Sequence, residues 1–225
     1  MTLTANAPAP AKKLLREAVH AQLRTDILSC RIPPGAEIRE AELAARFAVS
    51  KSPVRDALMH LEREGLVISS PRQGYRVSPV SLSDVQDMFH LRSVLERACM
   101  ERIVSLASDA QLATLDTFRR FDPDAWEGGL VAYNRAFHGT LAQLSHNKRM
   151  RDQITDLIEQ MERVVRVSLA SLKQESPASP VAEHCLIIDA LQARKARLAA
   201  RLAGQHIATA AQRVNDALAH HVIAS

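Results

Sequence analysis

Four side chains with metal-binding chemistry lie on faces that otherwise carry apolar residues. Asn134 and His138 are four residues apart, so they share one face of a helix. His184 and His206 lie on the apolar stripes of two later helical segments. Imidazoles on facing helices of a bundle can converge on one divalent ion, with Zn or Ni favoured and Mn open. We therefore predict that these four residues hold a metal; the alternative is that each histidine is a hydrogen-bonded core residue.

Arg92 is a further charged residue on an apolar stripe, between Phe89 and Leu95. Its guanidinium stays charged at physiological pH, and burying it unpaired is costly, so it needs an anion. Glu96, four residues on, is one candidate. The other candidate is the carboxylate of a small organic acid bound beside the metal. We predict that Arg92 contacts such an effector, with the Glu96 ion pair as the alternative.

The elements that position these residues are helices. Capping residues at 81–84 open a long helix with an apolar stripe that reaches Leu106. Further helical periodicity predicts five more helices over 109–121, 125–146, 148–172, 181–193 and 195–222, with Pro177 and Pro180 in the loop before the fifth of the six. Residues 80–222 are therefore expected to form an antiparallel six-helix bundle.

A separate domain with strands is expected over residues 12–78. Apolar spacing over 14–28 predicts a first helix, and Pro33, Pro34 and Gly35 end it. A short helix, a turn at 48–50 and a third helix, capped by Ser50 and ended by Gly65, make a helix-turn-helix. Two short strands over 66–69 and 75–77 read as a wing. The fold class is thus mainly α: a winged helix-turn-helix followed by an all-α bundle.

The charge distribution indicates where an anionic polymer would bind. Residues 1–78 hold 12 Lys and Arg against 8 Asp and Glu, whereas residues 79–225 hold 17 of each. A basic domain beside a neutral one fits binding of double-stranded DNA at one end, although chance clustering would give the same charge difference. The expected contacts are basic, small or polar residues around the third helix and the wing tip: Arg39, Lys51, Ser52, Pro53, Arg55, Arg72, Gln73 and Gly74. For Arg55 the alternative is a surface ion pair with Asp56 or Glu62.

Composition excludes several other classes of protein. No run approaches the roughly 20 apolar residues of a membrane span, and residues 1–11 resemble a disordered tail rather than a secretory signal. The three cysteines are widely spaced, which favours the reducing cytoplasm over a disulfide framework. Common catalytic templates such as GxSxG, HExxH and the P-loop are missing.

The N-terminal third resembles the GntR family of bacterial transcription regulators, through 42–44, 49–58 and 61–67 and the wing at 72–77. In that family the position of Lys51 is usually an arginine that reads guanine, and a second base-reading arginine matches Arg55. A third base-reading arginine, which some members carry, is replaced by Ala41 here. The C-terminal part resembles the FCD ligand-binding domain of the FadR subfamily, in its VanR-like branch. There the positions of Asn134, His138, His184 and His206 hold a divalent metal, and Glu183 precedes the second histidine. The resemblance also implies homodimers and small organic acids as effectors.

These observations together predict a cytoplasmic transcription regulator that acts as a repressor. Its binding to a palindromic operator would respond to a small organic acid at the metal site. One alternative is a metal-dependent hydrolase that activates water at the histidine cluster. It needs a general base beside the metal, and the apolar stripes carry no carboxylate next to the histidines. A non-specific DNA-compacting protein is the third reading, but it has no use for a polar cluster inside a neutral bundle.

Overall fold

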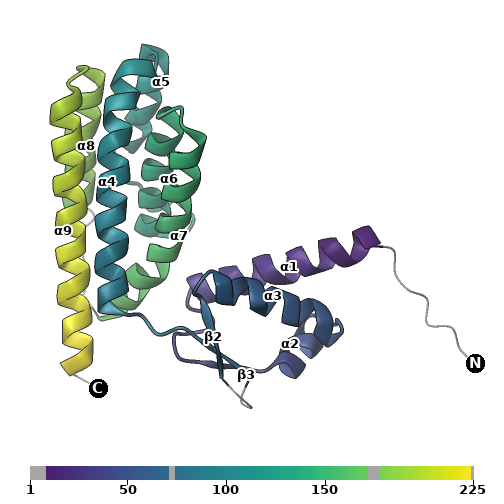
Figure 1. The fold of residues 1–225 in the computed structure, drawn as a ribbon. Coiled ribbons are helices and arrows are strands. Elements are labelled where there is room, and N and C mark those ends of the chain that lie inside the picture. The colour runs from purple at the N-terminus through teal and green to yellow at the C-terminus, as the bar shows by residue number, and fades with distance from the viewer. Residues whose placement is uncertain (1–8, 71–73, 172–177, 224–225) are drawn as a thin grey trace, which may run out of the picture. The chain divides into compact units, whose positions relative to one another are not determined.

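The computed structural model describes residues 9–70, 74–171 and 178–223 of the chain. Its internal contacts divide it into two compact units, Met1–Val80 and Ser81–Ser225. Figure 1 shows a mixed helical and stranded first unit and a second unit made of helices. Among the described residues, no helix is both long enough and apolar enough to cross a bilayer.

The first unit is a winged helix-turn-helix, as the sequence predicts. Its elements are α1 (Ala9–Leu28), β1 (Glu37–Ile38), α2 (Glu40–Arg46), α3 (Lys51–Arg63), β2 (Val67–Ser70) and β3 (Gly74–Val77). Helix α1 packs against α3, and apolar residues such as Leu23 and Leu58 are fully buried between the elements. The three strands form an antiparallel sheet in the order β1-β3-β2.

Three local features of this unit differ from the expectation. Helix α1 begins at Ala9, so residues 9–11 of the expected tail are helical; Pro10 is tolerated there because the first turn needs no N–H donors. Strand β1 was not predicted, since two residues are too few to show an alternating pattern. Ser50 occupies the N-cap of α3, but its hydroxyl makes no capping hydrogen bond.

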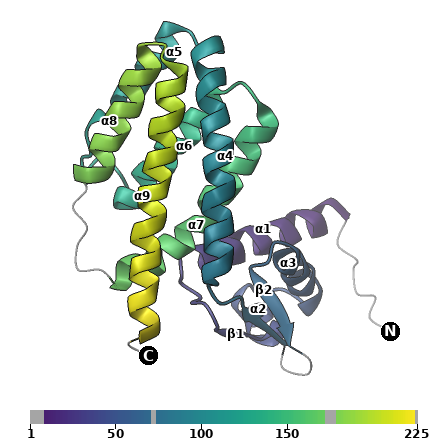
Figure 2. The ribbon, with the colours of Figure 1, turned by 60° about the vertical axis from the view of Figure 1, so that its left-hand side comes forward.

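The second unit is a helical bundle, and the prediction of six α-helices is confirmed for the described residues. They are α4 (Leu82–Leu106), α5 (Asp109–Ala113), α6 (Gly129–Leu144), α7 (Lys148–Ser171), α8 (Ala178–Gln192) and α9 (Ala196–Ile223), with a 3-10 helix η1 (Thr114–Arg119) after α5. The long helices α4 and α9 lie side by side, as Figures 1 and 2 both show.

Caps and glycines set the ends of these helices. The Ser81 hydroxyl accepts a hydrogen bond from the Asp84 amide, and Ser108 with Gln111 forms a complete capping box at α5. Helix α6 begins at residue 129 rather than 125, because Gly128 lies at φ +95° in a left-handed conformation. Pro180 lies in the first turn of α8 rather than in a loop, because a missing N–H breaks no hydrogen bond there.

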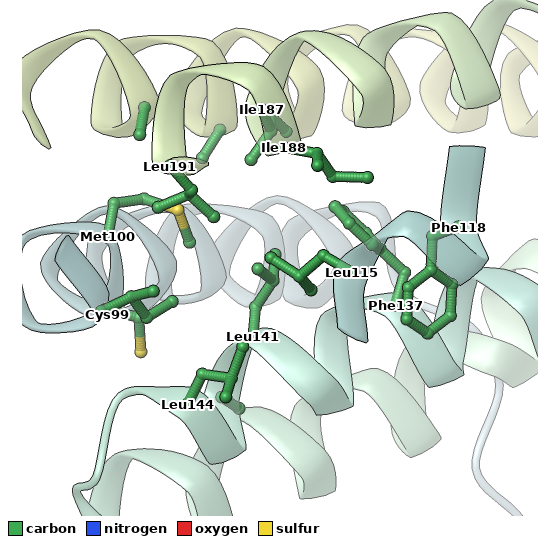
Figure 3. Packing of buried hydrophobic residues seen from close by; sticks show 14 of the residues in the cluster. Cys99, Met100, Leu115, Phe118, Phe137, Leu141, Leu144, Ile187, Ile188 and Leu191 are labelled. Carbon is green, nitrogen blue, oxygen red and sulfur yellow. The ribbon is translucent and has the colours of Figure 1, made fainter. Parts of the chain in front are cut away.

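The core of the bundle is built from aliphatic and aromatic side chains of several helices. Figure 3 shows Leu141 of α6 beneath Ile188 and Leu191 of α8, with Phe137 and Phe118 at one end. Tight packing of this kind fixes the backbone positions of the polar residues that interrupt the same helix faces. The core therefore acts as the scaffold for the histidines described next.

Candidate metal and effector site

Three histidines from three helices meet inside the bundle. His138 lies on α6, His184 on α8 and His206 on α9, with exposed fractions of 2%, 0% and 6%. The Nε2 atom of His206 is 3.3 Å from Nε2 of His184 and 3.2 Å from Nε2 of His138. One nitrogen from each ring can be chosen so that all three lie within 4.8 Å of one another. The structure thus brings together the histidines that the sequence singled out.

The other nitrogen of each ring is held by an oxygen. His138 Nδ1 lies 2.8 Å from Glu96 Oε2, and His206 Nδ1 lies 2.6 Å from Glu183 Oε2. His184 Nδ1 lies 3.2 Å from the Tyr133 hydroxyl. The Tyr133 hydroxyl donates its own proton to the Phe118 carbonyl, 2.6 Å away, so it must accept from His184.

These partners assign the proton of each ring to Nδ1. All three Nε2 atoms are then left with lone pairs, and these face a common point. Three lone pairs in such proximity repel unless a cation or a proton lies between them. Oxygen partners on the far nitrogens are typical of metal-binding histidines, so the donor set fits a divalent metal.

Burial disfavours the charged form of two of the three imidazoles, those of His138 and His184. Loss of solvation lowers the pKa of His138 to about 4, and the nearby Arg92 guanidinium acts in the same direction. The pKa of His184 is also held far below its ordinary value, first by burial and then by the neighbouring rings. Neutral imidazole is the protonation state that a metal requires.

Two carboxylates beside the histidines correct our sequence-based argument that none is present. Glu96 and Glu183 each contact a histidine at hydrogen-bond distance. Burial alone would raise the pKa of Glu96, but His138 and Arg92 outweigh it and hold the pKa well below its usual range. The helical stripes did not reveal these contacts because each carboxylate reaches a histidine on a different helix.

Arg92 forms the ion pair that was the alternative reading, and it also keeps a free donor. Its Nε donates to Glu96 Oε1 at 2.6 Å, so Glu96 joins Arg92 to His138. Its buried Nη2 atom has no hydrogen-bond partner. A buried guanidinium N–H without a partner is costly, which makes it a natural donor to a bound anion.

A cavity of about 120 Å³ adjoins the histidines. Arg92, Asn134, His138 and His206 line it, and Asn134 Oδ1 is buried without a hydrogen-bond partner. The rest of the wall is mainly apolar, with three charged residues, Arg135, Glu162 and Arg213. The apolar residues are Phe89, Leu130, Val131, Ile158, Met161, Val165, Pro180, Ala210 and Val214. His184 is not part of this wall. Cavity, free donor and free acceptor together suit a small ligand with a carboxylate and an apolar body.

Arg213 is a site residue that our sequence analysis missed. It lines the cavity from α9, and its Nη2 donates to Glu183 Oε1 at 2.7 Å. Glu183 in turn contacts His206, so Arg213, Glu183 and His206 form a chain of contacts. The sequence could have indicated Arg213, because it lies seven residues after His206, two turns along the same helix.

The residues expected to contact DNA lie around the start of α3. Lys51, Ser52 and Arg55 are exposed, and Pro53 is half-buried in the first turn. Arg55 forms a two-pronged ion pair with Glu40 rather than with Asp56 or Glu62. Arg39 precedes α2 and pairs with Glu37 and Glu42.

The wing tip is only partly described. Gly74 begins β3 at φ +92°, and a Cβ atom there would lie 2.9 Å from the Ile38 carbonyl oxygen. This close approach explains the glycine. Arg72 and Gln73 lie outside the described residues.

Comparison with known proteins agrees with both domains. Residues 15–77 match the gntR family of bacterial regulatory proteins, and residues 87–209 match the FCD domain. The chain is 30% identical over 145 residues to the uncharacterized HTH-type transcriptional regulator YdhC of Bacillus subtilis, covering 61% of this chain and 65% of that protein. It is 28% identical over 197 residues to the HTH-type transcriptional repressor RspR of Escherichia coli, covering 86% of each.

A solved structure supports the fold. The E. coli protein McbR/YncC matches 90% of this chain and 97% of its own with a TM-score of 0.73, at 20% identity. The matched families and relatives are transcriptional regulators, so the hydrolase alternative is rejected. The chain is a DNA-binding transcription regulator that belongs to the GntR family and carries an FCD domain.

Proposed function

We propose that this regulator binds a palindromic operator as a homodimer, and that a small organic acid at a metal centre in the bundle controls this binding. The observation that supports it best is the convergence of three histidine Nε2 atoms beside a cavity with an unpaired arginine donor. A repressor role is proposed because the relative RspR is named as a repressor.

The metal ligands would be His138, His184 and His206 through Nε2, with Asn134 through Oδ1. Three imidazoles favour Zn or Ni, with Mn as a further candidate. A bound dication would supply Lewis acidity for holding a carboxylate. The chain's own residues would orient the site: Glu96, Glu183 and Tyr133 lie beside the Nδ1 atoms, and a hydrogen bond from each Nδ1 would leave Nε2 free to bind the metal.

Charge balance supports an anionic effector. The carboxylates of Glu96 and Glu183 cancel the charges of Arg92 and Arg213, and burial lowers the pKa of both His138 and His184. These groups therefore sum to zero, and a dication would raise the sum to about +2. A carboxylate that accepts from Arg92 Nη2 would offset part of this charge, while the apolar wall would favour a ligand with a hydrocarbon body over a polycarboxylate.

The metal site is tested with protein that carries no affinity tag and has been treated with a chelator. Titration with zinc chloride is expected to show one ion per chain in the wild type and none in His184→Ala. The matched control is His90→Ala, which removes an exposed histidine on α4 and should leave zinc binding unchanged. Equal zinc binding by all three proteins would refute the site.

The DNA contacts are tested with a pool of random duplexes selected by the full-length protein. Lys51, Ser52 and Arg55 would meet base edges and phosphates, with Arg72 and Gln73 adding wing contacts. Arg55→Ala is expected to erase one base preference, at a cost of about 1–3 kcal/mol. A selected sequence that lacks two-fold symmetry would contradict the homodimer.

A further inference from the structure

The carboxylate of Glu40 accepts two hydrogen bonds from Arg55, the arginine proposed to read a base. Arg55 Nε donates to Glu40 Oε1 at 3.1 Å, and Arg55 Nη2 donates to Glu40 Oε2 at 2.9 Å. The contact joins the first residue of α2 to the second turn of the recognition helix α3. The side chain of Arg55 is 59% exposed, whereas that of Glu40 is only 21% exposed. Glu40 is thus the anchored partner, and Arg55 is the presented one.

The contact with Glu40 leaves one edge of the Arg55 guanidinium free for other hydrogen bonds. An arginine carries five N–H donors, and Glu40 uses the edge formed by Nε and Nη2. Within the described part of the chain, no hydrogen bond is made by Nη1 of Arg55. The pair of donors at Nη1 and Nη2 therefore remains available, and this edge can match the O6 and N7 acceptors of guanine. Hydrogen bonding from Arg55 also lowers the pKa of Glu40, so the carboxylate stays charged.

A carboxylate at a DNA-binding surface needs a reason. It repels the phosphate backbone and weakens binding to every sequence alike. As an exposed ion pair it would add little to the stability of the domain. A gain in selectivity would offset this loss, because a held guanidinium cannot swing away to a phosphate and needs two acceptors in one plane.

We propose that Glu40 is a positioning residue for base recognition, which orients Arg55 toward a guanine in the operator. The inference rests on the proposed contact between Arg55 and a base. It assigns Glu40 an effect on sequence preference that is separate from its charge and from its contribution to stability.

The test compares base preferences selected from a random duplex pool by full-length wild type, Glu40→Gln and Glu42→Gln. Glu42 is the matched control: it lies two residues on in α2, is exposed and pairs with Arg39 rather than Arg55. Both variants remove one negative charge, so both should bind a shuffled-sequence duplex more tightly by a similar factor. Only Glu40→Gln should lower the guanine preference at the Arg55 position, by about two- to fivefold.

A second variant separates the effect of the charge at position 40 from the effect of side-chain length. Glu40→Asp keeps the carboxylate but shortens it, so it should weaken the guanine preference without tightening non-specific binding. If Glu40→Gln and Glu42→Gln change base preference equally, or neither Glu40 variant changes it, the inference is wrong. Arg55→Ala distinguishes failure of the proposed base contact from failure of the role of Glu40. If Arg55→Ala leaves the selected sequence unchanged, the proposed base contact is wrong as well. If it erases one guanine while the Glu40 variants do not, only the role of Glu40 fails.

Discussion

Removal of the Tyr133 hydroxyl tests the arrangement of the histidines most directly. The substitution Tyr133→Phe keeps the buried ring and deletes one oxygen. That oxygen donates to the Phe118 carbonyl at 2.6 Å and accepts from His184 Nδ1 at 3.2 Å. Burial raises the pKa of Tyr133 to about 12, so the hydroxyl keeps its proton and both contacts are present at neutral pH.

Two separate effects are expected. A buried polar group left without its partner costs about 1–3 kcal/mol, and two such groups give about 2–6 kcal/mol of lost stability in the metal-free protein. Loss of a ring-orienting partner typically weakens metal binding about 10–100-fold. At saturating zinc, this roughly 10–100-fold loss of affinity lowers the stabilisation by bound zinc by about 1.4–2.7 kcal/mol more.

The assay is urea unfolding with and without excess zinc, followed by the fluorescence of Trp126. This is the only tryptophan of the chain, and its ring lies 5.5 Å from that of Tyr133, so it reports on the helical bundle. The matched control is Tyr75→Phe, because Tyr75 is the only other tyrosine and lies in the first unit. The control should leave the Trp126 transition unchanged. An equal loss for Tyr133→Phe with and without zinc would refute the orienting role, and no loss in either condition would refute the buried hydrogen bonds.

Three further predictions concern pH, backbone and ligand. The folded-state pKa of His138 is about 4, below the ordinary 6.5, so the metal-free protein should lose about 3 kcal/mol of stability as pH falls from about 6.5 toward 4. The lowered pKa of His184 acts in the same direction. Urea unfolding that is equal at pH 7 and pH 5 would contradict this. Gly74→Ala should destabilise the first unit by about 1–3 kcal/mol, since φ is +92° and the new Cβ would meet the Ile38 oxygen. The control Gly139→Ala, in open space on a helix, should be neutral or stabilising by up to about 1 kcal/mol, and a similar cost at both sites in calorimetry would remove the strain argument. Arg92→Gln should still bind zinc but lose binding of acetate and benzoate to the zinc-loaded protein; unchanged calorimetric titrations would return Arg92 to a purely structural ion pair.

The sequence predicted the histidine cluster because helical periodicity makes a polar residue on an apolar stripe easy to recognise. His138, His184 and His206 each interrupt such a stripe, and the packed core then brings them together. The same reasoning missed Tyr133 as a partner of His184, because an aromatic residue on an apolar face reads as core. Its hydroxyl contact depends on the rotation of α6 against α8, which periodicity within one helix does not encode.

Element boundaries were less predictable than element types. The helix expected over 109–121 is a five-residue α-helix followed by the 3-10 helix η1, a change of hydrogen-bond pattern that leaves the apolar spacing nearly the same. The late start of α6 depends on the left-handed backbone of Gly128. The pairing of Arg55 with Glu40 was missed because the two residues lie on different helices, 15 positions apart.

The carboxylate of Glu96, which joins Arg92 to His138, has a consequence for how the regulator would respond in a cell. If the metal and the acid each satisfy one end of this joined pair, their binding is thermodynamically linked. The acid must then strengthen metal binding by the same factor by which the metal strengthens binding of the acid. Scarcity of the metal would make the protein insensitive to the acid at concentrations that otherwise act on it. The regulator would therefore respond only when the acid and the metal are both present, rather than to either one alone.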